Sequence, residues 1–283
     1  MHTTHTLETA AGTLTLGQRP TIMGILNVTP DSFSDGGSYD GVDTAVRQAI
    51  ALADDGAEII DIGGESTRPG AEEVQVQDEL DRVMPILDAL KAISFKSLIS
   101  IDTYKPLVAD QALQAGACII NDVYGLQRDP EMADVAALHK APLIAMHWDK
   151  NRDRDKPLLD EVRRWFDRTI ATAENAGMYK SQLILDPGFG FAKTLDENYR
   201  LLRELGSFYP GYPIAVGTSR KSMIGKLLNR EVDERLPGTI ATNVLGYQSG
   251  AHLFRVHDPR PVRDALMVAA ATLYSLGVEG AQQ

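Results

Sequence analysis

The feature of this sequence that most restricts its fold is a series of eight short, continuously apolar segments, each ending in a polar residue or in glycine. Continuous rather than alternating apolar residues are typical of parallel strands that are buried on both faces. The segments span residues 22–27, 59–63, 98–102, 119–122, 143–147, 183–186, 214–217 and 253–257.

Helical patterns separate these segments, and one of them opens with Pro106 at the first helical position, where a missing N–H costs nothing. Eight strands that alternate with helices over about 250 residues predict an α/β fold, the (β/α)8 barrel. The expected helices span residues 42–54, 74–92, 106–114, 158–176, 195–205, 222–228 with 239–249, and 262–276.

The first segment of the chain has a different pattern. Residues 7–16, with Gly12 near their middle, predict a short N-terminal β-hairpin that caps the bottom of the barrel. The sequence contains no linker, low-complexity tract or break in composition, so we expect a single domain over residues 1–283.

Charge and composition exclude several classes of partner. The net charge of −11 disfavours nucleic acid and anionic membranes, because binding to them needs a basic face. A small anionic substrate remains possible, since a few cations can focus the field inside a cleft. The single cysteine, Cys118, lies in an apolar run and is predicted to be a core residue. Without a signal peptide or a membrane-spanning segment, the expected location is the cytoplasm.

Polar side chains at the ends of the predicted strands indicate an enzyme. The active site of such a barrel lies at the C-terminal ends of its strands. A single aspartate there is commonly a helix cap, but a polar ring around one mouth has no purely structural purpose. The ring comprises Asn27, Asp61, Asp102, Asn121, His147, Asp186, Ser219, Arg220, Lys221, Arg255 and His257.

The ring divides by charge into two halves. Asp102, Asn121 and Asp186 offer acceptors and an amide, which suit a neutral heterocycle with adjacent N–H donors. The opposite half holds cations near the seventh and eighth strands, where barrel enzymes often bind phosphate. Arg220 could instead be a solvated loop cation, and Lys221 could form a Schiff base.

Two long loops follow the first two strands, over residues 28–38 and 64–72. Both are rich in glycine and hydroxyl side chains, which favours a lid over the mouth. The alternative is ordinary turn chemistry around proline and glycine.

At these positions the chain resembles the dihydropteroate synthase family. The most specific matches are IMGILNVTPDSFSDGG at residues 22–37 and DIGGESTRPG at residues 61–70. SIDT (100–103), IND (120–122), MH (146–147), DPGFGF (186–191), TSRKSMIG (218–225) and RVHD (255–258) follow in the order of the family. The sequence departs from the usual pattern at Trp148, where many members have Met, and at Ala192, where many have Gly.

The resemblance implies condensation of 6-hydroxymethyl-7,8-dihydropterin diphosphate with p-aminobenzoate, giving dihydropteroate and pyrophosphate. The pterin would contact Asp102, Asn121, Met146, Asp186 and Lys221, and the diphosphate would contact Asn27, Arg255 and His257, with Asn27 also holding Mg²⁺. Phe33, Thr67, Arg68, Pro69, Phe191, Lys221 and Ser222 would form the p-aminobenzoate pocket, and Asp35 would order the closed site.

The resemblance also implies a homodimer that sulfonamide drugs could target. The residues expected to support catalysis are Lys221, Asp102, Asp186, Asp35 and Arg255, by a dissociative substitution that needs no protein nucleophile. His147 is expected to be structural. Two alternatives remain: a pterin-binding methyltransferase barrel, and a catalytically silent paralogue that binds pterin. The first has no evident use for the two long loops or for a diphosphate cradle.

Overall fold

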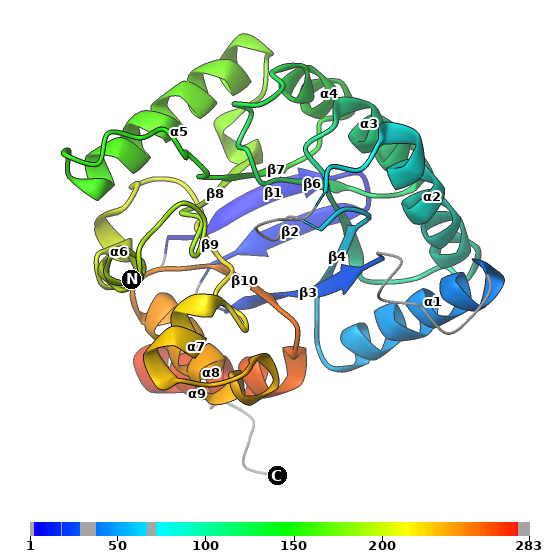
Figure 1. The fold of residues 1–283 in the computed structure, drawn as a ribbon. Coiled ribbons are helices and arrows are strands. Elements are labelled where there is room, and N and C mark those ends of the chain that lie inside the picture. The colour runs from blue at the N-terminus through cyan, green and yellow to red at the C-terminus, as the bar shows by residue number, and fades with distance from the viewer. Residues whose placement is uncertain (1–2, 18, 29–37, 67–71, 277–283) are drawn as a thin grey trace.

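The computed structural model describes residues 3–17, 19–28, 38–66 and 72–276 of the chain. Parallel strands lie at its centre with helices around them (Figure 1). The strands are hydrogen-bonded in the order β8–β7–β6–β5–β4–β3–β10–β9. Their bounds are Thr21–Asn27 (β3), Ile59–Gly63 (β4), Leu98–Asp102 (β5), Ile119–Asp122 (β6), Leu143–Met146 (β7), Leu183–Asp186 (β8), Ala215–Val216 (β9) and Leu253–Val256 (β10).

A parallel bridge between Leu185 and Ile214 joins the two outer strands, β8 and β9. The eight strands therefore close into the predicted barrel. Four of them have the predicted bounds. Of the other four, β7 and β10 end one residue earlier, before His147 and His257, β3 begins one residue earlier, and β9 is one residue shorter at each end. The side chains between strands and helices form one continuous apolar core.

The helices surround the barrel, and those predicted are present with ends within four residues of the expected ones; one further helix was not predicted. Their bounds are Ser38–Asp54 (α1), Val76–Ala92 (α2), Pro106–Ala115 (α3), Glu131–His139 (α4), Leu158–Asn175 (α5), Leu195–Arg203 (α6), Ser222–Leu228 (α7), Leu236–Gln248 (α8) and Pro259–Tyr274 (α9). Helix α4 was not predicted. Its buried face consists of Met132, Ala133 and Ala136, and its N-cap, Pro130, offers no capping side chain. Small buried residues make a weak periodic pattern.

The N-terminal hairpin closes the bottom of the barrel, as predicted. Strands β1 (His5–Thr9) and β2 (Gly12–Leu16) pair antiparallel around Gly12. Leu7, Leu14 and Leu16 pack against apolar residues from the barrel strands, among them Met23 and Cys118. Cys118 is 2% exposed, so it is a core residue.

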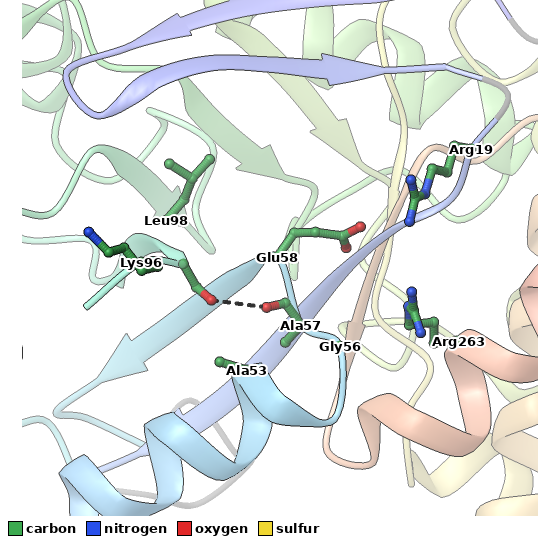
Figure 2. A pocket seen from close by; sticks show the side chains of 9 residues that line it. Arg19, Ala53, Gly56, Ala57, Glu58, Lys96, Leu98 and Arg263 are labelled. Atoms are coloured by element: carbon green, nitrogen blue, oxygen red, sulfur yellow. Dashed lines mark hydrogen bonds between the residues drawn. The ribbon is translucent and has the colours of Figure 1, made fainter. Parts of the chain in front are cut away.

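A second feature of this end is an open pocket of about 400 Å³ beside the N-terminal ends of β4 and β5 (Figure 2). Arg19, Glu58, Lys96 and Arg263 line it. Glu58 Oε2 accepts a hydrogen bond from the Ile22 backbone at 2.7 Å, which ties the start of β3 to β4. Because the bottom of such barrels serves stability, we assign this pocket a structural role.

The register of the strands brings the predicted site residues to the opposite rim. Asp102 pairs with Asn121 across β5 and β6, and Met146 pairs with Asp186 across β7 and β8. Asn27 lies opposite Gly63 at the end of β3. Among the described helices, none is both long and apolar enough to cross a membrane.

Candidate active site

An ion-pair network crosses the barrel mouth. Arg255 Nε donates to Asp61 Oδ2 at 2.6 Å, and its Nη2 donates to Asp102 Oδ2 at 2.6 Å. Asn121 Nδ2 also donates to Asp61 Oδ2, at 2.9 Å. Asp61 is fully buried, and Asp102 is 7% exposed. The carboxylate of Asp61 thus holds Arg255 and Asn121, two residues predicted to bind the two ends of the pterin diphosphate.

Asp61 is a residue to which the sequence assigned no binding role. The sequence shows Asp61 as a carboxylate inside an apolar strand. A buried charge of this kind needs an oppositely charged or hydrogen-bonding partner. The sequence could show that a partner was required. It could not show that the partner is Arg255, which lies 194 positions away along the chain.

Asp102 is held in a state close to protonation. Burial raises the pKa of Asp102 to about 7, against the lowering effect of Arg255, and Asp61 raises it further. Its Oδ1 is buried and has no hydrogen-bond partner among the described residues. A buried acceptor in that condition suits an N–H donor of a ligand, because leaving it unpaired costs about 1–3 kcal/mol.

Asp186 lies across the mouth from this network. Gly188 N donates to its Oδ1 at 2.7 Å, and burial raises the pKa of Asp186 while Lys221 opposes the shift. Gly217 marks where the two halves of the ring meet. A Cβ at Gly217 would lie 3.7 Å from Asp186 Oδ2, 3.8 Å from Lys221 Nζ and 3.9 Å from Arg255 Cβ. The acceptor and cationic halves are therefore neighbours.

Lys221 connects the acceptors to the sixth loop, residues 187–194 between β8 and α6. Its Nζ donates to the Phe189 carbonyl at 2.6 Å and lies 4.7 Å from the centroid of the Phe191 ring. Burial lowers the pKa of Lys221 to about 8, with Asp186 opposing. At neutral pH the ammonium form dominates, so this side chain acts as a cation and donor.

Aromatic side chains form one wall of the mouth. Met146 packs with Tyr104 and Val123, and Phe191 packs against this cluster. Trp148 stacks on Tyr124, with ring centroids 4.6 Å apart, and meets the Phe191 ring edge-on at 4.9 Å. Trp148, which departs from the family pattern, thus joins the loop after β7 to the sixth loop.

Several residues near the seventh and eighth strands and at the rim were considered for the phosphate side of the site. Arg220 makes two hydrogen bonds to Asp258, at 3.0 and 2.5 Å, so it is an ion-paired residue rather than a solvated one. His257 Nδ1 lies 3.0 Å from Ser219 Oγ, and this contact joins the ends of β9 and β10. Asn27 is half-buried at the rim, and Ser222 begins α7 as an exposed residue.

A buried network anchors the start of the second loop. Glu65 accepts from the Tyr104 hydroxyl at 2.8 Å and pairs with Lys105, which also lies 2.5 Å from Glu79. The predicted residues of the two long loops lie outside the described residues; they are Phe33, Asp35, Thr67, Arg68 and Pro69.

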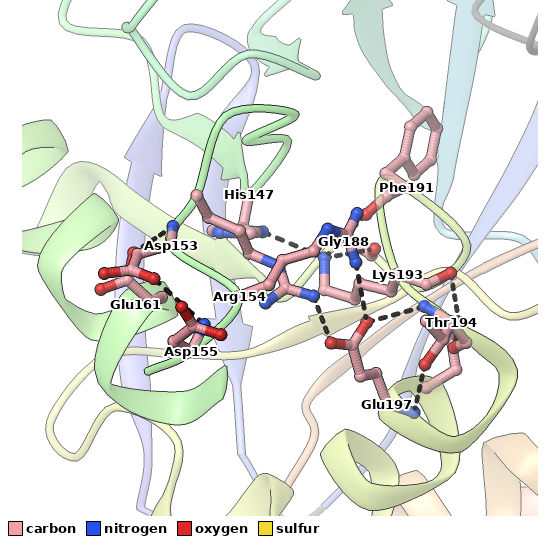
Figure 3. Close-up of polar contacts among 12 residues, drawn as sticks. His147, Asp153, Arg154, Asp155, Glu161, Gly188, Phe191, Lys193, Thr194 and Glu197 are labelled. Carbon is pink, nitrogen blue, oxygen red and sulfur yellow. Dashed lines mark hydrogen bonds and ion pairs between the residues drawn. The ribbon is translucent and has the colours of Figure 1, made fainter. Parts of the chain in front are cut away.

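His147 follows Met146 in the chain and packs edge-on against Trp165 of α5, with ring centroids 5.3 Å apart. Its Nδ1 is 3.0 Å from Lys193 Nζ, which also contacts the carbonyls of Gly188 and Phe191 (Figure 3). Burial lowers the pKa of His147 well below its ordinary value, and Lys193 lowers it further. A neutral imidazole in this position agrees with the structural role predicted for His147. The sequence did not identify Lys193, although it is the first cation after the DPGFGF segment.

Known proteins resemble the chain over nearly all of its length. Residues 23–257 match the family described as pterin-binding enzymes. A dihydropteroate synthase of Clostridium beijerinckii is 49% identical over 247 residues, which is 86% of this chain and 90% of the relative.

Two solved structures are similar in fold and in sequence. A dihydropteroate synthase of Clostridium difficile, determined in the presence of pteroic acid, has a TM-score of 0.88 and 45% identity, covering 91% of this chain and 98% of the other. One of Xanthomonas albilineans, with 4-aminobenzoic acid, has a TM-score of 0.90 and 44% identity, covering 95% and 98%. The chain belongs to the dihydropteroate synthase family of pterin-binding enzymes.

Proposed function

We propose that this chain condenses 6-hydroxymethyl-7,8-dihydropterin diphosphate with p-aminobenzoate, producing 7,8-dihydropteroate and pyrophosphate. The single observation that carries the proposal is the junction at Gly217, where Asp186, Lys221 and Arg255 come together within one barrel mouth. Buried acceptors there suit the aminopyrimidinone edge of a pterin, and the adjacent cations suit a diphosphate. The two solved relatives were determined with compounds of these classes: pteroic acid contains a pterin ring, and 4-aminobenzoic acid is the second substrate proposed here.

The pterin ring fits the acceptor half. Asp102 Oδ1, Asn121 and Asp186 would receive its N–H groups, while Met146 would pack on the ring face. A carboxylate can accept from two adjacent donors at once, which an amide cannot do. Asp186 is already oriented by Gly188, so little reorganisation would be needed on binding.

Breaking of the C–O bond between the exocyclic CH₂ and the diphosphate is the step that the cationic half favours. Arg255 and His257 would stabilise the charge that develops on the leaving group, and the carboxylates would oppose positive charge spreading into the ring. The amine nitrogen of p-aminobenzoate then forms the C–N bond and loses a proton. Phe191 and Lys221 would position this second substrate.

Mg²⁺ fits the donor set at the rim. Asn27 offers an amide oxygen, a hard ligand, and Mg²⁺ usually keeps several waters while bridging one or two protein ligands and substrate phosphates. Oxygens of the diphosphate would complete the coordination of the ion. When bound, the ion would neutralise charge on the leaving group.

We also propose a homodimer located in the cytoplasm. Helices α7, α8 and α9 lie at one side of the barrel in Figure 1, and each of them carries exposed apolar residues. These are Leu227 and Leu228 on α7, Leu245 on α8, and Val268 and Leu273 on α9. Exposed apolar residues gathered on neighbouring elements are common at subunit interfaces. Sedimentation of the purified chain should give about twice the monomer mass of 30.9 kDa.

The test of the activity uses both substrates with Mg²⁺ and follows dihydropteroate and pyrophosphate by chromatography. Product that depends on both substrates supports the synthase. Tight pterin binding without product would favour the methyltransferase or the silent paralogue. If the chain neither bound the pterin nor formed product, the proposed function would be refuted.

A further inference from the structure

The sixth loop, residues 187–194, carries contacts to both proposed substrates. It starts directly after Asp186, the proposed acceptor for the pterin, and contains Phe191, a proposed contact of p-aminobenzoate. Lys221 lies against the same loop, at the Phe189 carbonyl. The conformation of this loop therefore sets the distance between the two parts of the site.

Lys193 reaches back from the end of this loop and holds its middle. Its Nζ lies 2.9 Å from the Gly188 carbonyl, 3.1 Å from the Phe191 carbonyl and 3.0 Å from His147 Nδ1 (Figure 3). An ammonium has three donors, and the two carbonyls can only accept. In the ammonium form, with His147 Nδ1 as the third acceptor, three donors meet three acceptors. Burial lowers the pKa of Lys193 to about 7, against the raising effect of Asp186, so this form is fully present only below that pH.

The contact at Gly188 transmits this restraint to Asp186. The carbonyl of Gly188 is held by Lys193, and its N–H donates to Asp186 Oδ1 at 2.7 Å. Gly188 has a φ of +71°, and a Cβ there would lie 2.0 Å from the His147 carbonyl. Only glycine can occupy this position, and the peptide has little room to move. Its orientation therefore depends on the partners of its N–H and carbonyl.

The other residues around Lys193 show that its Nζ contacts the loop backbone and His147 rather than a carboxylate. No carboxylate of the described residues lies within ion-pair distance of its ammonium. Glu197 of α6 instead pairs with Arg152 of the loop after β7, and it forms a capping box with Thr194. This second contact fixes the start of α6, directly after Lys193, and so fixes the origin of the lysine side chain.

We propose that Lys193 is a positioning residue: its ammonium, shared by Gly188, Phe191 and His147, sets the sixth loop so that Asp186 and Phe191 receive the two substrates together. Removing it should loosen the loop at both ends. A misplacement of about 1 Å in a site can cost about 100-fold in rate, so an effect of about tenfold on each KM is reasonable.

The test compares Lys193→Met with Lys156→Met. Lys156 is an exposed lysine of the loop after β7, so its replacement controls for the loss of a charge. In a chain that keeps its circular dichroism spectrum, Lys193→Met should raise the KM for p-aminobenzoate about tenfold and weaken pterin binding in calorimetry. A role in folding alone would lower kcat, through fewer active molecules, at unchanged KM. That second result would overturn the proposal.

A second pair of variants covers the case in which Lys193→Met does not fold. His147→Asn keeps an acceptor near the position of Nδ1, whereas His147→Leu removes it. His147→Leu should raise the KM for p-aminobenzoate relative to His147→Asn, and equal KM values would overturn the proposal.

Because the role of Lys193 rests on the proposed function, the unaltered chain is assayed first. If the unaltered chain were inactive, the proposed synthase reaction would be refuted, but the role of Lys193 in positioning the loop would still be open to test. Calorimetric binding of p-aminobenzoate and pterin to Lys193→Met would then decide the role of Lys193, with unchanged affinities counting against it.

Discussion

Arg255 Nη2 lies 2.6 Å from Asp102 Oδ2, so a cation assigned to the diphosphate is bound to a carboxylate assigned to the pterin ring. Asp61 holds the same guanidinium from the other side, at 2.6 Å. The network keeps the charges of the mouth close to balance before a substrate arrives. It also means that a change in one of these residues should affect the others.

Asp61 should matter although it is not expected to touch a substrate. Asp61→Ala leaves Arg255 and Asn121 without their shared acceptor and should destabilise the fold by about 3 kcal/mol, since breaking a buried pair from one side costs about 3–5 kcal/mol. We expect kcat/KM for the pterin diphosphate to fall about 100-fold. Urea unfolding and steady-state kinetics would measure both, with Asp61→Asn, which keeps an acceptor, as the milder variant. Unchanged stability and activity in Asp61→Ala would contradict the role of the network.

Asp186 should be indispensable for pterin binding. Asp186→Asn replaces one acceptor oxygen with a donor amide, so two adjacent N–H groups can no longer both be satisfied. We expect calorimetry to show at least a 100-fold loss of affinity for a pterin. Asp196→Asn, on the exposed start of α6, is the matched control and should bind normally. Micromolar affinity in Asp186→Asn would rule out the assignment.

The ionisation of Asp102 should appear in the pH dependence of pterin binding. Its pKa of about 7 in the folded chain means that lowering the pH through 7 converts an acceptor into an O–H group. Pterin affinity should therefore decrease as the pH falls from 8 to 6. In Asp102→Asn the affinity should be lower but without this transition. A flat profile for the unaltered chain would show that another acceptor dominates.

The same ionisation has a consequence for stability, with a sign that follows from the direction of the shift. The folded-state pKa of Asp102 lies above the model-compound value of 3.8, so the native state binds a proton that the unfolded chain has released between these two values. This residue's contribution to stability is complete below pH 3.8 and is lost as the pH rises through 7.

Trp148 should influence the second substrate rather than the first. Trp148→Ala removes the stack on Tyr124 and the edge contact to Phe191, and aromatic pairs contribute about 0.5–1.5 kcal/mol each. The KM for p-aminobenzoate should rise about three- to tenfold while pterin affinity stays the same. Tyr179→Ala, at an exposed aromatic residue that precedes the N-terminal end of β8, opposite the mouth, should change neither value. A larger effect on pterin would mean that the aromatic wall serves the other substrate.

The barrel was predictable because each strand is buried on both faces, which leaves a continuous apolar run in the sequence. The same apolar runs predicted Asp102 and Asp186 correctly as the last residues of their strands. It failed for α4, whose buried face is made of small residues such as Ala133 and Ala136 and leaves a weak pattern.

Contacts between distant strands were the part that sequence patterns could not supply. The pairing of Asp61 with Arg255 depends on β4 and β10 both flanking β3, and on side chains that cross the mouth. The grip of Lys193 on Gly188 depends on a positive φ that no local propensity fixes beyond the presence of glycine. Arg220 was left between two roles because its partner, Asp258, belongs to another strand end.

The hairpin of β1 and β2 has a consequence for the order of events. Leu7, Leu14 and Leu16 fill the floor of the barrel, so in the described part of the chain substrates approach the strand-end residues from the C-terminal mouth. The proposed pterin contacts Asp102, Asn121 and Asp186 are strand-end residues, whereas most proposed p-aminobenzoate contacts belong to the loops that follow the strands, so the pterin site is the inner of the two. We therefore expect the pterin diphosphate to bind ahead of p-aminobenzoate, and the joined product to leave by the way its parts came in.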